Sequence, residues 1–411
     1  MNSTVRWQLF AMMALQFFIW GAWLPLVWDY MGAGGLGFDA AQQAWVGSAF
    51  AIASIVAVFF SNQFVDRTFA AERFVAFSHV VGGGAMLGLW WATDFRTFLL
   101  LMLLHSLFYV PTISVTNTLA FANLREPQRE FGLVRMGGTL GWIAAAWPLY
   151  FVMQGQPAAE KIAASRDMFM VSAVASFVLA AFALRLQHTP PKQAIATADR
   201  LARMKALRLL SHPYLFVLFL VTLVDATIHN GYFKMAGGFL GDIGFAREDV
   251  MPVMSLGQVA EILTMLALGA VLTRLGWRWT MTLGILGHAA RFLVFALFGD
   301  ADHHALIVAV QLLHGICYAF FFATVYIFVD ASFPKDVRTS AQGLFNLLML
   351  GLGDLIANWL FFPLRESLRL PGGGVDYRTL FLWPTGMALF GAVLLALCFR
   401  PPAAAAPDAG T

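Results

Sequence analysis

The sequence predicts an all-α integral membrane protein in which twelve transmembrane helices form two six-helix bundles. Twelve apolar stretches of about 18 to 28 residues fill most of the 411-residue chain, and a helix needs roughly 20 such residues to cross the bilayer core. Hydrophobic residues make up 60% of the chain and charged residues only 12%, against about 25% in soluble domains. A polar segment near the middle separates the first six stretches from the last six.

Each predicted span is bounded by the polar residues on either side of its apolar stretch. The spans are 7–31, 41–65, 74–93, 97–122, 134–153, 167–186, 213–240, 250–273, 279–299, 304–330, 340–363 and 379–400. The first is too long for a cleavable signal peptide, so we expect it to remain as the first helix. Sixteen of the 26 Lys and Arg residues lie in segments that this topology places inside the cell, and seven lie outside. By the positive-inside rule both termini are cytoplasmic.

The same pattern divides the chain into two halves and a connection. We expect an N-terminal bundle over 1–186, a cytoplasmic linker over 187–212, a C-terminal bundle over 213–400 and a cytoplasmic tail over 401–411. The basic stretch from Arg200 to Arg208 fits either a helix on the inner leaflet or a solvated connection. Short basic loops after the second and eighth spans echo each other. Six-plus-six layouts of this kind build the major facilitator fold, whose substrate site lies at mid-membrane between the halves.

Charged residues interrupt several predicted spans, where charge is costly and usually serves a function. They are Arg135, Asp225, Lys234, Glu261, Arg291 and Asp354. In the eighth span, Ser255, Gln258 and Glu261 recur every three residues and therefore share one helical face. Burial disfavours the charged form of a carboxylate, so Glu261 is a candidate for proton uptake and release. The alternative is that Glu261 is locked to an arginine as a packing clamp.

The fifth span offers a partner face for this acid. Arg135, Thr139 and Trp142 place a cation, a hydroxyl and an aromatic ring on one side of the helix. Such a face can hydrogen-bond a polyhydroxylated ligand and stack on a planar ring. Arg135 lies close to the cytoplasmic end, so the alternative is that it only extends to the membrane surface. In the first span, Gln16 and Trp20 lie deep enough to be candidates for the same cavity.

Other spans carry unusual numbers of polar residues. The fourth contains a group that either lines the cavity or bonds neighbouring helices: Tyr109, Thr112, Thr116 and Asn117. The seventh contains Asp225, His229, Asn230 and Lys234. Because Asp225 and His229 are four residues apart on a helix, they could share a proton. In the ninth and eleventh spans we expect interhelical hydrogen bonds from His288, Arg291, Asp354 and Asn358.

The cysteine content argues against metal or redox chemistry. Cys317 and Cys398 are the only cysteines, and both lie in predicted spans, so the sequence offers no disulfide framework and no metal-ligand spacing. We expect neither a metal nor a cofactor. A membrane enzyme should show a nucleophile, metal ligands or a large polar domain, and a sensor should carry a soluble output domain. The sequence indicates neither class.

Motifs dispersed along most of the chain resemble the nucleoside:proton symporter family of the major facilitator superfamily. They are, in order, Leu15-Gln16-Phe17, Trp20-Gly21, Trp23-Leu24, Tyr109, Pro111-Thr112, Asn117-Thr118, Arg135, Gly138-Thr139, Gly141, Trp147, Gln258, Glu261, Arg291-Phe292, and Arg338 with Ser340-Ala341-Gln342-Gly343. The resemblance implies proton-driven nucleoside uptake. It also implies that four residues occupy positions that bind substrate or couple protons in relatives: Arg135, Thr139, Gln258 and Glu261.

The chain departs from that family at two places. Ala319 stands where characterised members carry an aspartate, and Lys234 follows Asn230 on a helix where relatives place amide side chains. If the missing carboxylate binds substrate or a proton in relatives, this chain must supply an acid from elsewhere. Asp225 is the nearest candidate by chemistry.

These patterns predict a proton-coupled nucleoside importer that works by alternating access in the cell inner membrane. The expected substrate-binding residues are Gln16, Trp20, Tyr109, Asn117, Arg135, Thr139, Trp142, Asn230, Gln258, Glu261 and Tyr318, and the expected proton-coupling residues are Glu261, Asp225 and Arg135. We expect a monomer whose partners are a small-molecule nucleoside and the lipid bilayer, not nucleic acid, with the proton as coupling ion. The nearest alternative keeps the fold and changes the cargo to a sugar or another polar metabolite.

Overall fold

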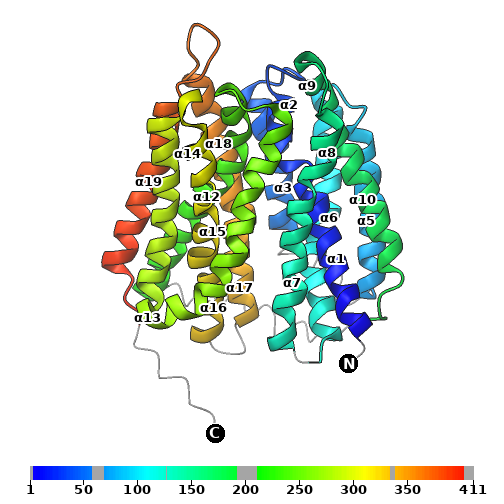
Figure 1. Cartoon of the computed structure of the whole chain (residues 1–411). Coiled ribbons are helices and arrows are strands. Elements are labelled where there is room, and N and C mark those ends of the chain that lie inside the picture. Colours follow the sequence, from blue (N-terminus) through cyan, green and yellow to red (C-terminus); the bar gives the residue numbers. More distant parts are fainter. Residues whose placement is uncertain (1–2, 58–68, 126, 192–210, 334–337, 402–411) are drawn as a thin grey trace.

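Helices make up almost all of the protein. The computed structural model describes residues 3–57, 69–125, 127–191, 211–333 and 338–401. Figure 1 shows the helices running side by side between two ends of the molecule, with α1 starting and α19 ending at the same end. Within the described ranges the only β-structure is one isolated bridge between Arg369 and Val375. The predicted all-α class is confirmed, whereas the basic stretch of the linker and the tail beyond Pro401 lie outside the described residues.

The helix bounds are as follows. The N-terminal half contains α1 (Ser3–Gly21), α2 (Leu24–Met31), α3 (Ala40–Val56), α5 (Ala71–Leu89), α6 (Phe95–Asn123), α7 (Pro127–Ala144), α8 (Ala146–Met153), α9 (Ala158–Ala164) and α10 (Asp167–Ala183). The C-terminal half contains α12 (Pro213–Asp242), η2 (Arg247–Asp249), α13 (Val250–Phe298), η3 (Ala301–His303), α14 (His304–Val310), α15 (Leu313–Cys317), η4 (Tyr318–Ala323), α16 (Thr324–Ser332), α17 (Arg338–Asn346), η5 (Leu347–Leu352), α18 (Gly353–Ser367) and α19 (Tyr377–Cys398).

Prolines explain where two predicted spans divide into shorter helices. Helix α1 ends at Gly21 and α7 ends at Ala144, in each case four residues before a proline, Pro25 or Pro148. A proline ring removes one backbone donor and clashes with the carbonyl four residues earlier, so the helix stops there and a new one begins. The first and fifth predicted spans therefore each consist of two helices in succession.

Nine helical segments in the described part of the chain are long and apolar enough to cross a membrane. One of them, Arg247–Phe298, contains the eighth and ninth predicted spans. Between these two spans the backbone of α13 leaves helical geometry at Gly276, where φ is +69°. This left-handed conformation suits glycine, which has no Cβ. The tenth and eleventh predicted spans contain the π-helical segments η4 and η5 near their middles. The second predicted span extends beyond the described residues, since α3 ends at Val56.

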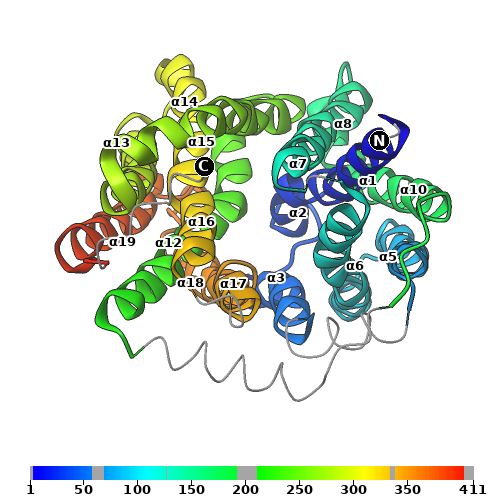
Figure 2. The ribbon, with the colours of Figure 1, turned by 90° about the horizontal axis from the view of Figure 1, so that it is seen from below.

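The helices gather into two groups that meet along a limited interface. Figure 2 shows α1 to α10 in one group and α12 to α19 in the other. Contacts between the groups are made by α3 with α18 and η5, by α2 with α12, and by α7 and α8 with α13. Each contact pairs one element from each half of the sequence, so the space between the groups is lined by both halves.

Ion pairs join the groups at the end opposite the start of α1. Arg247 of η2 pairs with Asp29 of α2, and its Nε donates to Ser165 Oγ at 2.6 Å. Lys161 of α9 donates to the Glu248 carboxylate at 2.6 Å. Figure 1 shows α2 and α9 at this end, and shows the ribbon of α7 well separated from those of α16 and α17 at the other end. The groups are therefore closed against each other at the α2 end.

Close packing of α1 on α7 depends on glycine. A Cβ added at Gly141 would lie 1.9 Å from the backbone oxygen of Ala14, and one added at Gly137 would lie 2.5 Å from that of Phe10. Small residues let helix backbones approach closely in membranes, where the hydrophobic effect does not drive helices together. The position of α1 against α7 is thus set by the backbone itself.

We expect Gly141→Ala to destabilise the fold by about 1 to 3 kcal/mol, because the new methyl group overlaps a backbone atom and α1 must move. The measurement is the melting temperature of the purified protein in detergent. Gly132→Ala on the same helix is the control, since nothing lies within 4 Å of its added Cβ, and alanine favours a helix. Equal melting temperatures for the two variants would show that α1 can shift without cost.

Candidate functional site

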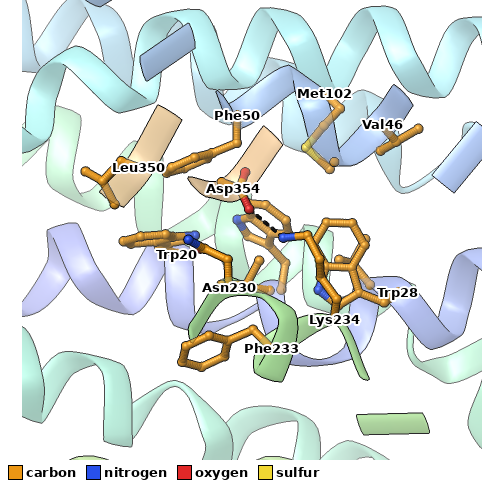
Figure 3. A pocket seen from close by; sticks show the side chains of 14 residues that line it. Trp20, Trp28, Val46, Phe50, Met102, Asn230, Phe233, Lys234, Leu350 and Asp354 are labelled. Carbon is orange, nitrogen blue, oxygen red and sulfur yellow. Dashed lines mark hydrogen bonds and ion pairs between the residues drawn. The ribbon is translucent and has the colours of Figure 1, made fainter. Parts of the chain in front are cut away.

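A pocket lies between the two groups and is lined by both. Figure 3 shows aromatic side chains around a lysine and an aspartate. The lining residues are Trp20, Trp23, Leu24, Val27, Trp28, Val46, Gly47, Phe50 and Met102 of the first group and Asn230, Phe233, Lys234, Leu350 and Asp354 of the second. Trp20 and Asn230 were predicted for a substrate site, and the structure brings them to one pocket.

A series of aromatic contacts runs from the first group to the second near this pocket. Trp20 stacks on Phe50 with ring centroids 4.9 Å apart, and its ring meets that of Trp142 edge to face at 5.4 Å. Trp142 in turn contacts Phe233 of the other group at 5.8 Å. Aromatic faces of this kind suit a planar ligand ring. Trp142, which was predicted to bind the substrate, therefore lies beside Trp20.

Indole donors without acceptors surround the same pocket. Trp20, Trp23 and Trp28 each have a buried Nε1–H with no hydrogen-bond partner among the described residues. A buried N–H without an acceptor is costly, so such groups usually meet water or a ligand. The pocket therefore combines apolar walls with donors that remain available, which is the usual character of a small-molecule site.

One buried ion pair forms the polar wall of the pocket. Lys234 of α12 donates to Asp354 Oδ1 of α18, and its ammonium lies 4.9 Å from the centroid of the Trp28 ring. Asn230 donates to the backbone oxygen of Met349 at 2.9 Å. The interhelical bond expected of Asp354 is confirmed. The sequence did not indicate that Lys234 and Asp354 are partners or that both face this pocket.

Arg135 and Glu261 attract each other electrostatically across the interface. The guanidinium of Arg135 lies over the Phe17 ring at 4.1 Å and interacts electrostatically with the Glu261 carboxylate and the Tyr318 hydroxyl. Arg135 belongs to α7, Glu261 to α13 and Tyr318 to η4, and α7 contacts α13. A cation of one half therefore faces an acid of the other.

The absence of a side chain at Gly138 leaves room for the Arg135 guanidinium. A Cβ at Gly138 would lie 2.5 Å from Arg135 Nη1 and 2.7 Å from Phe17 Cδ2. The guanidinium can fold back along α7 onto the Phe17 ring only because this side chain is absent. Thr139, the hydroxyl expected at the site, is half-buried and follows directly after this glycine.

Gln258, one turn before Glu261, faces inward. Its side chain is 5% exposed, and its amide lies 3.3 Å from His314 Nε2. His314 also lies 3.0 Å from Arg291 Nη1. The predicted interhelical role of Arg291 is confirmed. Sequence reasoning missed His314, although an isolated histidine in an apolar span is the same kind of signal that identified Glu261.

Several other predicted site residues bond neighbouring helices. Gln16 is fully buried, and its amide donates to Thr112 Oγ1 at 2.8 Å and lies 2.9 Å from His79 Nε2. The Tyr109 hydroxyl donates to the backbone oxygen of Gln16 at 2.6 Å. Of the two roles considered for the fourth span, Tyr109 and Thr112 thus fill the bonding role. Asn117 is half-buried further along α6.

Asp225 has a different partner from the one expected. Its Oδ1 lies 2.8 Å from His288 Nδ1 of α13, whereas His229 Nδ1 has no hydrogen-bond partner in the described part of the chain. The helical spacing of Asp225 and His229 was a poor guide because a residue on the neighbouring helix competes for the carboxylate. Asn358 also differs from expectation: neither side-chain polar atom has a partner among the described residues.

No site for a metal ion is found in the residues that the structure describes. Groups of three or more His, Cys, Asp or Glu side chains placed to hold a metal do not occur among them. The lining of the pocket offers aromatic rings, the amide of Asn230 and the charges of Lys234 and Asp354, whereas Arg135 and Glu261 lie outside this lining. These groups can bind a polar organic ligand and exchange protons.

Comparisons with known proteins give a consistent assignment. The family described as nucleoside H+ symporter matches residues 1–404. The putative nucleoside transporter YegT of Escherichia coli is 34% identical over 390 residues, covering 94% of this chain and 90% of that protein. Xanthosine permease and the nucleoside permease NupG of the same organism are each 26% identical; the matches cover 97% and 96% of this chain and 96% and 95% of those proteins.

Solved structures show the same fold. The crystal structure of a NupG variant superposes with a TM-score of 0.86 at 24% identity, covering 96% of this chain and 100% of that one. A bacterial homologue of the human lysosomal transporter Spinster superposes with a TM-score of 0.76 at 13% identity, covering 98% and 99% of the two chains. These proteins are transporters, so the arrangement of two helix groups around a pocket is shared with proteins that move solutes.

We expect Thr139→Val to weaken ligand binding by about 1 kcal/mol or more, because a methyl group cannot replace a hydroxyl that bonds the ligand. Arg135→Lys should weaken it further, since lysine lacks the planar fork that lies on Phe17. Binding of radiolabelled uridine and adenosine to the purified protein measures both effects. Thr273→Val, at an exposed threonine of α13, is the control. Unchanged affinity in both site variants would place the ligand away from α7.

Proposed function

The chain belongs to the nucleoside H+ symporter family, and we propose that it imports nucleosides together with protons across the bacterial inner membrane. It is a multi-pass transporter and not an enzyme. In this proposal the chain has twelve spans in two six-helix bundles, 1–186 and 213–400, joined by a cytoplasmic linker over 187–212, with both termini cytoplasmic. It works as a monomer in the bilayer and uses no cofactor other than the proton.

The electrostatic attraction between Arg135 and Glu261 is the observation that carries this proposal. It joins a titratable acid of one half to a cation of the other at the interface that must open and close. Protonation of Glu261 removes the attraction for Arg135, so a proton weakens the α7–α13 contact. The released guanidinium can then turn to the ligand. Proton binding and the relative position of the two halves are coupled in this way.

The pocket supports a nucleoside as the ligand. A nucleoside combines a planar base with a hydroxylated sugar, and the site combines stacked aromatic rings with polar groups. In this proposal the base lies against Trp20 and Trp142, and the sugar hydroxyls meet Arg135, Thr139 and Gln258. In the proposed topology the ion pairs of Arg247 and Lys161 lie on the periplasmic side, and we infer from them a conformation that faces the cytoplasm.

A thermal-shift series distinguishes nucleosides from other cargo. We expect uridine or adenosine to raise the melting temperature of the purified protein, because a ligand that binds only the folded state stabilises it. Ribose, glucose and xylose serve as the comparison set at equal concentration. A shift with a sugar and none with any nucleoside would replace this proposal by transport of a sugar or a related polar metabolite.

We expect Glu261→Gln to reduce nucleoside accumulation while sparing nucleoside exchange, because the amide keeps the shape of the acid but cannot carry a proton. One pH unit is worth about 1.4 kcal/mol and 100 mV about 2.3 kcal/mol per charge, so one proton supports roughly 500-fold accumulation. Uptake into proteoliposomes under both gradients measures the loss.

Glu366→Gln, an exposed acid at the end of α18, is the matched control and should accumulate nucleoside as the native protein does. If Glu261→Gln also accumulates nucleoside to the native level, Glu261 carries no coupled proton. The packing-clamp interpretation of the Arg135 contact would then be correct.

A further inference from the structure

A second set of buried polar groups lies inside the C-terminal half. Asp225 of α12 and His288 of α13 are 1% and 0% exposed, and they bond to each other at 2.8 Å. The ring of His229 lies 5.8 Å from that of His288 and 5.1 Å from that of His314, measured between centroids. Three imidazole rings thus lie in sequence, and the ring of His288 bonds to the Asp225 carboxylate. The mechanism proposed above uses none of them.

Arg291 determines the protonation of His314. A guanidinium can only donate, so His314 Nδ1, 3.0 Å from Arg291 Nη1, must accept. The ring is therefore neutral and carries its proton on Nε2, which faces the Gln258 amide at 3.3 Å. Rotating that amide by half a turn lets its oxygen accept this proton, and gives a partner to an atom that otherwise has none among the described residues. His314 is consequently not a site of proton uptake.

His229 is the ring that connects the cluster to the pocket. It is half-buried, whereas His288 and His314 are buried, and its Nδ1 has no partner in the described part of the chain. Its ring contacts that of Phe233, a pocket residue, at 5.4 Å and that of Tyr318 at 6.2 Å. His229 therefore stands between the pocket and the bond of Asp225 with His288.

We propose that Asp225 and His288 form a second proton-binding site, loaded from the pocket through His229, so that two protons accompany each nucleoside. This inference rests on the proposed function. A proton binds one ring nitrogen of His229 while the proton on its other nitrogen passes to His288 Nε2, so only N–H bonds form and break. The loaded site is an imidazolium–carboxylate pair, in which the two charges compensate each other.

Several charged and titratable groups lie near the site formed by Asp225 and His288, and they influence the charge that it can carry. The charged and titratable groups near it are His229, Tyr232 and Lys234 of α12, Arg291 and Glu261 of α13, His314 and Cys317 of α15, and Tyr318 of η4. Lys234 is neutralised by Asp354. Arg291 lies 3.9 Å from the Tyr232 ring centroid and keeps its positive charge close to the cluster.

The proton count is measured directly by a reversal experiment in proteoliposomes with the membrane potential held at zero. At the point of no net flux, one pH unit sustains about a tenfold nucleoside gradient for one coupled proton and a hundredfold gradient for two. We expect the hundredfold limit for the native protein and the tenfold limit for Asp225→Asn. A tenfold limit for the native protein overturns the second site but leaves nucleoside–proton symport intact. A native protein without nucleoside uptake overturns the proposed function itself.

Two further variants show whether the lower limit of Asp225→Asn comes from misfolding, and whether the proton passes through His229. Asp225→Asn combined with His288→Gln leaves two neutral amides that can bond each other, and it should also show the tenfold limit. His229→Gln should slow the approach to the limit, and an unchanged rate removes His229 from the route. Asp300→Asn, which alters an exposed aspartate bonded to His303 at 2.7 Å, is the matched control and should keep the hundredfold limit. Loss of the second proton in this control would make the effect nonspecific.

Discussion

The cost of charge in a medium without water governs this molecule. A charged side chain in the middle of the bilayer needs a compensating group there. The structure pairs Lys234 with Asp354 and Asp225 with His288, each from another helix, and an electrostatic attraction links Arg135 to Glu261. These partners fix which helices are neighbours. The same requirement explains how a proton can change the contacts between helices. When a proton binds a paired acid, the attraction to its partner is lost, and water does not replace it.

The fold was largely predictable because its rules are local. Apolar length identifies spans. The ends of α1 and α7, four residues before a proline, were not predicted, and Pro111, Pro363 and Pro384 lie inside continuous helices, so a proline alone does not mark a helix end. The π-helical segments at η4 and η5 were not predictable, since they arise from packing between helices. The division into two bundles follows from the order of the spans. The packing of helices within a bundle depends on backbone approaches such as that of Gly141 to Ala14, which no spacing reveals.

The candidate site was also predictable only in part. Polar residues at helical spacing identified Arg135 and Glu261, because charge in an apolar span is visible in the sequence. Their partners were less predictable: spacing suggested His229 for Asp225, whereas α13 brings His288. Pocket residues such as Phe50 look like any other apolar residue of a span. Ala319 of η4 is fully buried and carries no acid. Asp354 lines the pocket, whereas Glu261 and Asp225 lie on α13 and α12 outside its lining.

The ion pairs within a group are more deeply buried than those between the groups. This difference explains how each group can be rigid while the two groups move relative to each other. Within the second group, the side chains of Lys234 and Asp354 are 3% and 9% exposed, and separating such a pair costs about 3 to 5 kcal/mol. Between the groups, the side chains of Arg247 and Asp29 are 15% and 32% exposed and those of Lys161 and Glu248 are 16% and 12% exposed. Water reaches these pairs more than it reaches Lys234 and Asp354, so it replaces more of their attraction. The partly exposed pairs of the closed end therefore break first. Each group keeps its internal pairs and moves as a unit, which alternating access requires.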